Sequence, residues 1–373
     1  MHNTIIEINS IQFITNLKAI RQHLDKKSKN TKFCLPVKAN AYGHGLVGIA
    51  KLAEPYVDYF GVACLDEGIT LREGGICKPI LVFGAFSDEQ IASLILYNLD
   101  ITISSHYKAK SVSQFCHQEN KECRVHIKVD TGMNRIGVRV ESSHALINYV
   151  MQQPHLKLVG VYSHLASSDD LDSSFTDKQI EQFSQVTDYV KNIKSDIICH
   201  LANSGGICYF PDTYFDMVRP GILCYGYFPA KTIDIYPLNQ IKPCFSLKSK
   251  VVYFKVVDKL QRISYNQKYI TQTTTRVVTL PIGYGDGYRR MLSNLGEVLI
   301  RGKKYTIAGI ICMDMLMVDI GANGEAYIDD EVVLIGTQGN AEISLNSVAA
   351  KCNTINYEIL CGFNQRIPRI FTI

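Results

Sequence analysis

The sequence predicts an α/β fold in which a (β/α)8 TIM-type barrel is followed by a mostly β C-terminal domain. Its 373 residues exceed the usual size of a single domain and leave room for a deep core. Up to residue 226, short β-branched runs alternate with stretches in which apolar side chains have helical spacing. After residue 227 this alternation stops, and turn signals separate further β-rich runs. Strands that alternate with helices pair in parallel, and eight such repeats favour a closed barrel.

Eight apolar runs are the expected barrel strands. They cover residues 33–39, 59–65, 79–85, 100–105, 124–130, 156–164, 196–204 and 217–226. Two intervening stretches, 45–57 and 177–193, have clear helical spacing of apolar residues. Thr176 and Asp177 are the N-cap candidates for the second of these helices.

The domain boundary is expected near residue 236. The segment YFPAKTIDIYPLNQIKP, residues 227–243, carries three prolines and has no clear periodicity. We therefore predict a barrel domain over 1–236 and a β domain over 237–373, and the first ~10 residues could pair with the β domain.

The composition argues against several classes of protein, namely nucleic-acid-binding, zinc-binding and membrane proteins. Lys and Arg number 39 against 35 Asp and Glu, without a long basic run, so no nucleic-acid partner is expected. The 12 cysteines are scattered without zinc-like spacing, which indicates reduced thiols and no metal site. No signal-peptide pattern and no long apolar run occurs, so we expect a cytoplasmic protein without a membrane partner.

Polar side chains follow several of the expected strands at their carboxyl ends, where barrels carry their chemistry. Lys38 ends the first strand, a position at which a buried ammonium is unusual. The other candidates are Lys128, Asp130 and Arg135 after the fifth strand, His164 after the sixth, Asn203 and Ser204 after the seventh, and Arg219 in or after the eighth. These groups are expected on one rim of the barrel.

An anion site is expected in the loops after the seventh and eighth strands. Ser204, Gly205, Gly206 and Gly221 would let backbone N–H groups approach a phosphate closely. An amine that faces a phosphate site indicates a phosphorylated aldehyde held as a Schiff base, which is pyridoxal 5'-phosphate. The alternative is that Lys38 reaches solvent and pairs with a carboxylate.

VKANAYGHG, at 37–45, opens a series of motifs that continues towards the C-terminus. The others are KVDTGMNRIG, YSHLASSDD, ANSGG, VRPGI, ISYN, PIGYGDG, ICMDMLMVD, YEIL and RIPRIF. In this order, and at these separations, they resemble the alanine racemases, a pyridoxal-phosphate-dependent family of fold type III. The resemblance covers nearly the whole chain.

The resemblance implies which side chains hold the cofactor. Lys38 would form the Schiff base and act as one catalytic base, while His164 and Arg219 would lie beside the pyridine ring. The remaining cofactor contacts would come from Tyr42, Asn203, Ser204, Gly221, Ile222 and Tyr357. An arginine at the ring nitrogen has no acceptor and keeps its proton, which suits simple proton exchange. The alternative for Arg219 is a salt bridge near Asp216.

The resemblance also implies a second base from another subunit. Racemisation needs a base on each face of a planar carbanion, and Lys38 supplies only one face. Tyr265 of the partner chain would supply the other, with His164, linked to Arg219, stabilising its phenolate. The protein would therefore be a homodimer with composite active sites. Asn266 follows this tyrosine where relatives usually have glycine, and asparagine tolerates the positive φ such a loop needs.

Substrate contacts are implied in the same way. Arg135 would clamp the substrate carboxylate, and Tyr284 and the Met313 backbone N–H of the partner would help to bind it. Lys128 occupies the place at which many relatives carry a carbamylated lysine that orients this arginine. The alternative is that Lys128 pairs with Asp130 or a neighbouring strand.

The implied activity is interconversion of L-alanine and D-alanine, which supplies D-alanine for cell-wall peptidoglycan. A broad-specificity amino-acid racemase has the same chemistry and differs only in pocket volume. A non-catalytic pyridoxal phosphate protein would have no reason to keep Tyr265 and Tyr284, and a decarboxylase would favour an acidic partner for the ring nitrogen.

Overall fold

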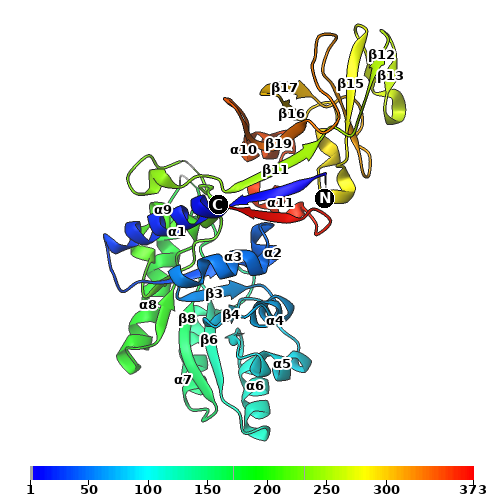
Figure 1. Cartoon of the computed structure of the whole chain (residues 1–373). Coiled ribbons are helices and arrows are strands. Elements are labelled where there is room, and N and C mark those ends of the chain that lie inside the picture. The colour runs from blue at the N-terminus through cyan, green and yellow to red at the C-terminus, as the bar shows by residue number, and fades with distance from the viewer. Residues whose placement is uncertain (1–2, 171, 231) are drawn as a thin grey trace. The chain divides into compact units, whose positions relative to one another are not determined.

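The computed structural model describes residues 3–170, 172–230 and 232–373, and Figure 1 traces the whole chain. The chain divides into two compact units. The barrel unit contains Gln12–Ala41 and Leu46–Pro243. The β unit contains Met1–Ile11, Tyr42–Gly45 and Cys244–Ile373. The change of unit after Pro243 lies seven residues beyond the position suggested by the sequence, and the β unit takes two short segments from the N-terminal part of the chain.

The barrel unit confirms the predicted fold class. Its eight strands are β2 (Lys32–Pro36), β3 (Tyr59–Val62), β4 (Ile80–Val82), β5 (Asp100–Ile103), β6 (Cys123–Asp130), β8 (Leu156–Tyr162), β9 (Ile198–His200) and β10 (Met217–Val218). They pair in parallel in the order β10-β2-β3-β4-β5-β6-β8-β9. The barrel nearly closes, because Asp216 N–H donates to Cys199 O over 2.9 Å beside β9 and β10.

The strands are short and buried on both faces, as parallel strands covered by helices should be. Every residue of β3 and β5 is buried. A two-residue strand, β7 (Val138–Arg139), pairs with the end of β6.

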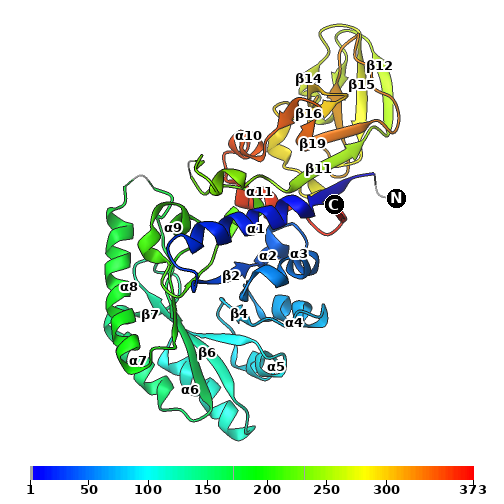
Figure 2. The same cartoon turned by 60° about the vertical axis from the view of Figure 1, so that its left-hand side comes forward.

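Helices lie around these strands in both views (Figures 1 and 2). They are α1 (Ser10–Asp25), α3 (Leu46–Ala53), α4 (Leu65–Glu73), α5 (Ile91–Leu96), α6 (His106–Gln118), α7 (Val140–Met151), α8 (Ser174–Ile193) and α9 (Ser204–Tyr209). Helix α8 buries Phe183, Val186 and Val190 along one stripe, which confirms its predicted amphipathic face.

The predicted N-cap of α8 is wrong. The helix begins at Ser174, three residues before Asp177, so Thr176 and Asp177 lie inside its first turn. Ser173 Oγ donates to the Asp177 carboxylate over 2.8 Å, and this bond holds the turn that precedes the apolar pattern.

The β unit is built on one mixed sheet with the strand order β17-β16-β19-β11-β1-β21, and β20 pairs with β19. These strands are β1 (Ile5–Asn9), β11 (Phe245–Lys250), β16 (Glu297–Ile300), β17 (Lys303–Thr306), β19 (Glu331–Gln338), β20 (Ala341–Ile343) and β21 (Arg369–Thr372). Strand β1 lies between β11, to which it is antiparallel, and β21, to which it is parallel.

Smaller elements complete the β unit. A three-stranded sheet joins β12 (Tyr253–Val257), β15 (Thr275–Leu280) and β18 (Leu316–Asp319), and β13 (Arg262–Ile263) pairs with β14 (Tyr269–Ile270). Two helices, α10 (Leu345–Lys351) and α11 (Asn356–Gly362), follow the last hairpin. No helix of the described ranges is long and apolar enough to cross a membrane.

Candidate active site

Lys38 follows the carboxyl end of β2 and opens an unusual turn, α2 (Lys38–Tyr42). Ala39, Asn40, Ala41 and Tyr42 have φ values of 53°, 55°, 53° and 52°, which is a left-handed helical conformation. L-residues in this conformation cost about 1–2 kcal/mol each. The surrounding structure holds the turn, since Ala39 N–H donates to Glu67 over 2.6 Å and the Asn40 side chain accepts from Leu46 N–H over 2.8 Å. Strain of this kind concentrates at functional sites.

Arg219 is held rigidly inside the barrel directly after β10. It is only 4 % exposed. One guanidinium nitrogen, Nη1, lies 2.8 Å from His200 Nδ1, and the other, Nη2, donates to the carbonyl oxygens of Ser163 and Leu201. Burial lowers the pKa of Arg219 to about 10, so the side chain is a cation at neutral pH. The alternative pairing with Asp216 does not form, because that carboxylate pairs with Lys191 over 2.7 Å.

Four basic side chains of the predicted site lie close enough to His164, which follows β8, to affect its pKa. Burial lowers the pKa of His164 well below its usual value, and the charges of Arg219, Lys128, Arg135 and Lys38 lower it further. The structure therefore brings these predicted residues into one electrostatic neighbourhood. His164 is a neutral imidazole there, and it can donate only one N–H.

Lys128 lies on β6, is almost fully buried and donates to its neighbour's carbonyl, Val129 O, over 2.8 Å. Burial lowers the pKa of Lys128 to about 7, the nearby charges of Arg219 and Arg135 lower it too, and Asp130 opposes the shift. A large share of its amine is therefore unprotonated at neutral pH.

Arg135 lies in the loop after β6 and is exposed. The Asp130 carboxylate organises this loop, because its Oδ1 accepts from the backbone N–H groups of Gly132 and Asn134 over 2.9 and 3.1 Å. Gly137 allows a close return of the chain, since a Cβ there would lie 2.8 Å from the Asp130 nitrogen. Asp130 thus positions the arginine loop.

The loops after β9 and β10 are joined through Ser204. Its buried Oγ accepts from the N–H groups of Gly221 and Leu223 over 2.9 and 3.3 Å. Asn203 caps α9 by accepting from Gly206 N–H over 2.9 Å. A Cβ at Gly205 would lie 2.4 Å from Ser168 Oγ, so this glycine is required for close packing. Because Ser204 bonds to the residues on both sides of Ile222, the loops that carry Ser204, Gly221 and Ile222 are held together.

Tyr42 and Tyr357 are neighbours within the β unit. Their ring centroids are 6.0 Å apart. Tyr357 belongs to α11, and Gly43 fits against the end of that helix, since a Cβ on Gly43 would lie 2.1 Å from Leu360 O. Arg369 Nε donates to Gly43 O over 2.9 Å and fixes the segment further.

Tyr265 is presented on a tight turn between β13 and β14. It is 65 % exposed. Ser264, Asn266 and Gln267 around it have φ values of 65°, 54° and 55°. The positive φ at Asn266 confirms the expectation that asparagine can take the place usually held by glycine. The Ser264 hydroxyl donates to Ile310 O and anchors the turn.

Tyr284 and Met313 lie on two loops that are bonded to each other. Tyr284 N–H donates to Cys312 O over 3.1 Å, and Gly285 N–H donates to Met313 O over 2.8 Å. A Cβ on Gly283 would lie 2.3 Å from both of these carbonyl oxygens. Arg366 links the loops by ion pairs to Asp314 at 2.8 Å and to Asp286 at 3.4 Å.

The sequence reasoning missed several polar residues inside the barrel. His200 contacts Arg219 and stacks on Tyr162, with ring centroids 4.8 Å apart and an angle of 8°. His126 on β6 follows, with Nδ1 only 3.1 Å from His200 Nε2. The available signal was one histidine in each of two buried strands, at positions where a polar group needs a partner.

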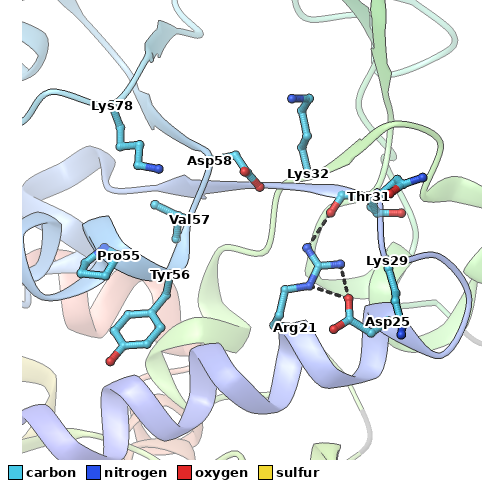
Figure 3. A pocket seen from close by; sticks show the side chains of 11 residues that line it. Arg21, Asp25, Lys29, Thr31, Lys32, Pro55, Tyr56, Val57, Asp58 and Lys78 are labelled. Carbon is cyan, nitrogen blue, oxygen red and sulfur yellow. Dashed lines mark hydrogen bonds and ion pairs between the residues drawn. The ribbon is translucent and has the colours of Figure 1, made fainter.

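An open pocket of about 420 Å³ lies elsewhere, at the amino ends of the strands (Figure 3). Its lining includes Lys32, Asp58 and Lys78, which precede or begin β2, β3 and β4. Arg21 on α1 donates hydrogen bonds to the Asp25 carboxylate and to Thr31 O at this pocket. The predicted site residues of the barrel follow the opposite ends of the strands. Within the described residues, no cluster of three or more His, Cys, Asp or Glu has the arrangement of a metal site.

Comparisons with known proteins agree along the whole chain. Residues 8–229 match the family model of the alanine racemase N-terminal domain, and residues 244–371 match that of the C-terminal domain. An alanine racemase of Halothermothrix orenii is 41 % identical over 98 % of this chain and 95 % of the relative. One of Carboxydothermus hydrogenoformans is 40 % identical over 95 % of this chain and 98 % of the relative.

Solved structures give the same result. An alanine racemase of Clostridium difficile 630 superposes with a TM-score of 0.93 and 35 % identity, covering 100 % of this chain and 96 % of that one. The alanine racemase structure from E. faecalis has a TM-score of 0.91 and 33 % identity, and the match covers 100 % of this chain and 98 % of the other.

Proposed function

Because the chain belongs to the alanine racemase family, whose members are isomerases, we propose that it interconverts L-alanine and D-alanine by a two-base mechanism with pyridoxal 5'-phosphate as cofactor. The observation that carries this proposal is the burial of Arg219 beside a neutral His200, with Lys38, Lys128 and Arg135 close enough to lower the pKa of the nearby His164. A cation fixed at this point is what a neutral ring nitrogen requires.

The barrel residues fit the cofactor chemically. Lys38 offers a primary amine at the carboxyl end of β2, and Ser204, whose Oγ accepts from the Gly221 amide in this structure, offers a hydroxyl donor for a phosphate. The amides of Gly221 and Ile222 are proposed as further phosphate donors once the cofactor is bound. Pyridoxal phosphate, when bound, withdraws electrons from the substrate α-carbon and makes its proton acidic.

Arg219 determines which reaction follows once the α-proton of the substrate has become acidic. Its guanidinium carries only N–H donors, so it can donate to a ring nitrogen but cannot give that nitrogen a full proton. An acidic partner, by contrast, would protonate the ring and favour decarboxylation or transamination. The buried arginine therefore supports proton exchange and argues against the decarboxylase alternative.

Two bases move the α-proton. The Lys38 amine removes or returns it on one face, and the partner subunit's Tyr265 returns or removes it on the opposite face. The exposure of Tyr265 on a strained turn supports a role towards another subunit. His164 is neutral, so in this proposal it assists the phenolate by donating its single N–H rather than as a cation.

The substrate carboxylate is held by Arg135, assisted by the partner subunit's Tyr284 and Met313. The protein is accordingly a homodimer whose sites each take residues from both chains. Several large apolar side chains of the β unit are exposed in the single chain, among them Met291, Leu295, Met313 and Met315, and these would be covered in a dimer.

Lys128 is carbamylated in this proposal. Its unprotonated amine bonds to the carbon of CO2 and loses one proton, which yields a carbamate anion. Burial and the charges of Arg219 and Arg135 disfavour an ammonium here, and the two arginine charges favour an anion in its place. The carbamate then accepts hydrogen bonds from Arg135 and orients it.

We place this activity in the cytoplasm, where it would supply D-alanine for peptidoglycan. A broad-specificity amino-acid racemase remains the second candidate, since it needs the same catalytic groups and differs in the volume left for the substrate side chain. A panel of L-amino acids distinguishes the two, because the first candidate turns over alanine in clear preference to long basic side chains.

The test is chiral analysis of the purified, cofactor-loaded protein supplied with L-alanine and, separately, with D-alanine. Lys38→Ala should abolish the yellow absorbance and the activity. Tyr265→Ala should keep the absorbance and suppress interconversion, whereas Tyr253→Phe, at another exposed tyrosine of the β unit, should change neither. Unimpaired turnover in both directions by Tyr265→Ala would refute the two-base assignment.

A further inference from the structure

A line of buried polar side chains runs through the barrel interior from Arg219 to Asp100. Arg219 Nη1 lies 2.8 Å from His200 Nδ1, and His200 Nε2 lies 3.1 Å from His126 Nδ1. His126 Nε2 then lies 3.4 Å from Asp100 Oδ2, which is an electrostatic contact and not a hydrogen bond. Both histidines are fully buried and Asp100 is 1 % exposed. Burying so many polar groups is unfavourable unless they satisfy one another, so their alignment requires an explanation.

Two local features of the chain create room for this line. The pairing of β6 with β8 shifts register between Val125 and His126, because β8 has one extra residue, Val159, at this point, and His126 therefore lies opposite Gly160. On β8, a Cβ at Gly160 would lie 2.3 Å from His126 Nδ1, so only glycine leaves space for the imidazole to reach His200. Both features act at the same residue.

The far end of the line is anchored by Arg124. Its Nε donates to Asp100 Oδ1 over 2.8 Å, and its Nη2 donates to Asp100 Oδ2 over 3.2 Å and to the Tyr59 hydroxyl over 2.6 Å. Burial alone would raise the pKa of Asp100, but the contact with His126 and the bonds from Arg124 hold it below its usual value. Asp100 is therefore an ionised carboxylate and a pure acceptor.

The two ends fix the direction of every hydrogen bond between them. A guanidinium only donates, so His200 Nδ1 must accept and the proton of this neutral imidazole must be on Nε2. His200 Nε2–H then donates to His126 Nδ1, which leaves the His126 proton on Nε2, facing a carboxylate that only accepts. The pKa of His200 is lowered well below its usual value by burial and by Arg219, in keeping with a neutral ring.

We propose that Asp100 is a positioning residue for Arg219. Its charge holds the His126 proton on Nε2, and this one-way relay through His126 and His200 presents an imidazole lone pair to the guanidinium. The proposal rests on the function proposed above, in which Arg219 faces the ring nitrogen of the cofactor. Without the carboxylate, both imidazoles can take the opposite tautomer. His200 Nδ1–H would then point at an Arg219 N–H, and the guanidinium would turn away from its working orientation.

The first test is neutron diffraction from deuterium-exchanged crystals of the cofactor-loaded wild-type protein. Deuterium is expected on Nε2 of both His200 and His126, with Nδ1 of each ring bare. Deuterium on His200 Nδ1 would overturn the proposal. This measurement does not depend on turnover, so it stands apart from the racemisation assay and keeps the two claims separable.

The second test is Asp100→Asn, because its amide can donate to His126 and reverse the relay. Deuterium should move to Nδ1 of His200, and kcat should fall about ten- to a hundredfold while KM changes by less than about twofold. Asp58→Asn is the matched control. Asp58 directly precedes β3, and the one hydrogen bond that its carboxylate accepts within the described residues comes from Phe33 N–H, over 2.8 Å, a bond that an amide oxygen can also accept.

A double-mutant cycle separates positioning from a merely structural role. In His200→Asn, the amide oxygen can accept from Arg219 whatever the state of His126, so adding Asp100→Asn should then cost almost no further activity. An equal loss in both backgrounds would show that Asp100 acts on the fold rather than through the relay. If Asp100→Asn does not fold, the wild-type neutron map still decides the proposal.

Discussion

Lys128 shows how much one residue's surroundings can change its chemistry. Its pKa of about 7 means that the amine is largely protonated below that pH and largely free above it. Only the free amine attacks CO2, so the carbamate should be present well above pH 7 and lost well below it. Intact mass under native conditions should therefore differ between the two pH values by the mass of one CO2.

Two controls belong to this prediction. Lys128→Met should show no such difference at either pH, and its KM for alanine should rise because Arg135 loses its anionic partner. Density for a bare ammonium at a pH well above 7, with CO2 present, would contradict the proposal.

The left-handed turn after Lys38 leads to a second prediction about a single residue. Ala39 is exposed and has a φ of 53°, a conformation that glycine adopts without strain. Ala39→Gly should raise the free energy of unfolding by about 1 kcal/mol, because the relief of strain exceeds the added chain entropy. Chemical denaturation of the wild type and the variant measures this difference.

The matched control is Ala92→Gly on the right-handed helix α5, where the alanine is also exposed. It should lower the free energy of unfolding by about 1 kcal/mol. Opposite signs for the same substitution are the expected result, and equal signs would mean that the turn is not under strain.

At the scale of elements, the loops of Tyr284 and Met313 depend on Arg366. This side chain pairs with Asp314 and Asp286, one on each loop, while the backbone bonds already described join the two. Arg366→Leu should loosen both loops and lower kcat/KM about tenfold, mainly through KM, since these loops contact the substrate in the proposed mechanism.

Arg301→Leu is the control for losing a surface arginine in the same unit. Arg301 also pairs with two carboxylates, Asp330 at 3.0 Å and Glu325 at 3.6 Å, but it lies at the turn between β16 and β17. Its kcat/KM should stay within about twofold of wild type. If Arg366→Leu and Arg301→Leu lower kcat/KM equally, Arg366 has no specific role in holding the two loops.

Some elements were predictable because their signal is local. The barrel strands could be predicted from their apolar, β-branched runs. Lys38, His164 and Arg219 could be found because they follow such runs. The left-handed turn at 39–42 could not be predicted, since alanine and tyrosine do not favour positive φ and only tertiary bonds hold them there. The relay through His126 could not be predicted either, because it needs an extra residue and a glycine on β8 opposite a histidine on β6, which no single stretch of sequence reveals.

At the scale of the whole molecule, the proposed composite site predicts complementation between inactive variants. Lys38→Ala and Tyr265→Ala dimers should each be inactive alone. When equal amounts are dissociated and reassociated, half of the dimers are mixed, and each mixed dimer has one site with both bases intact. Activity should recover to about a quarter of the wild-type value.

Separate subunit tags and native mass spectrometry would confirm that mixed dimers have formed in this experiment. Mixed dimers without any recovered activity would mean that Lys38 and Tyr265 of the same chain serve one site, and the composite arrangement would be wrong.

The position of β1 between β11 and β21 has a consequence for biosynthesis. Residues 5–9 leave the ribosome early, but the strands on either side of them, 245–250 and 369–372, are translated only after the whole barrel. The barrel can fold while its chain is still growing, whereas β1 must wait for its first neighbour until translation has passed residue 250 and for its second until it has passed residue 372. The nascent protein thus carries an open strand edge while the barrel is being translated, and chaperones that shield such edges should stay bound until β21 has been made.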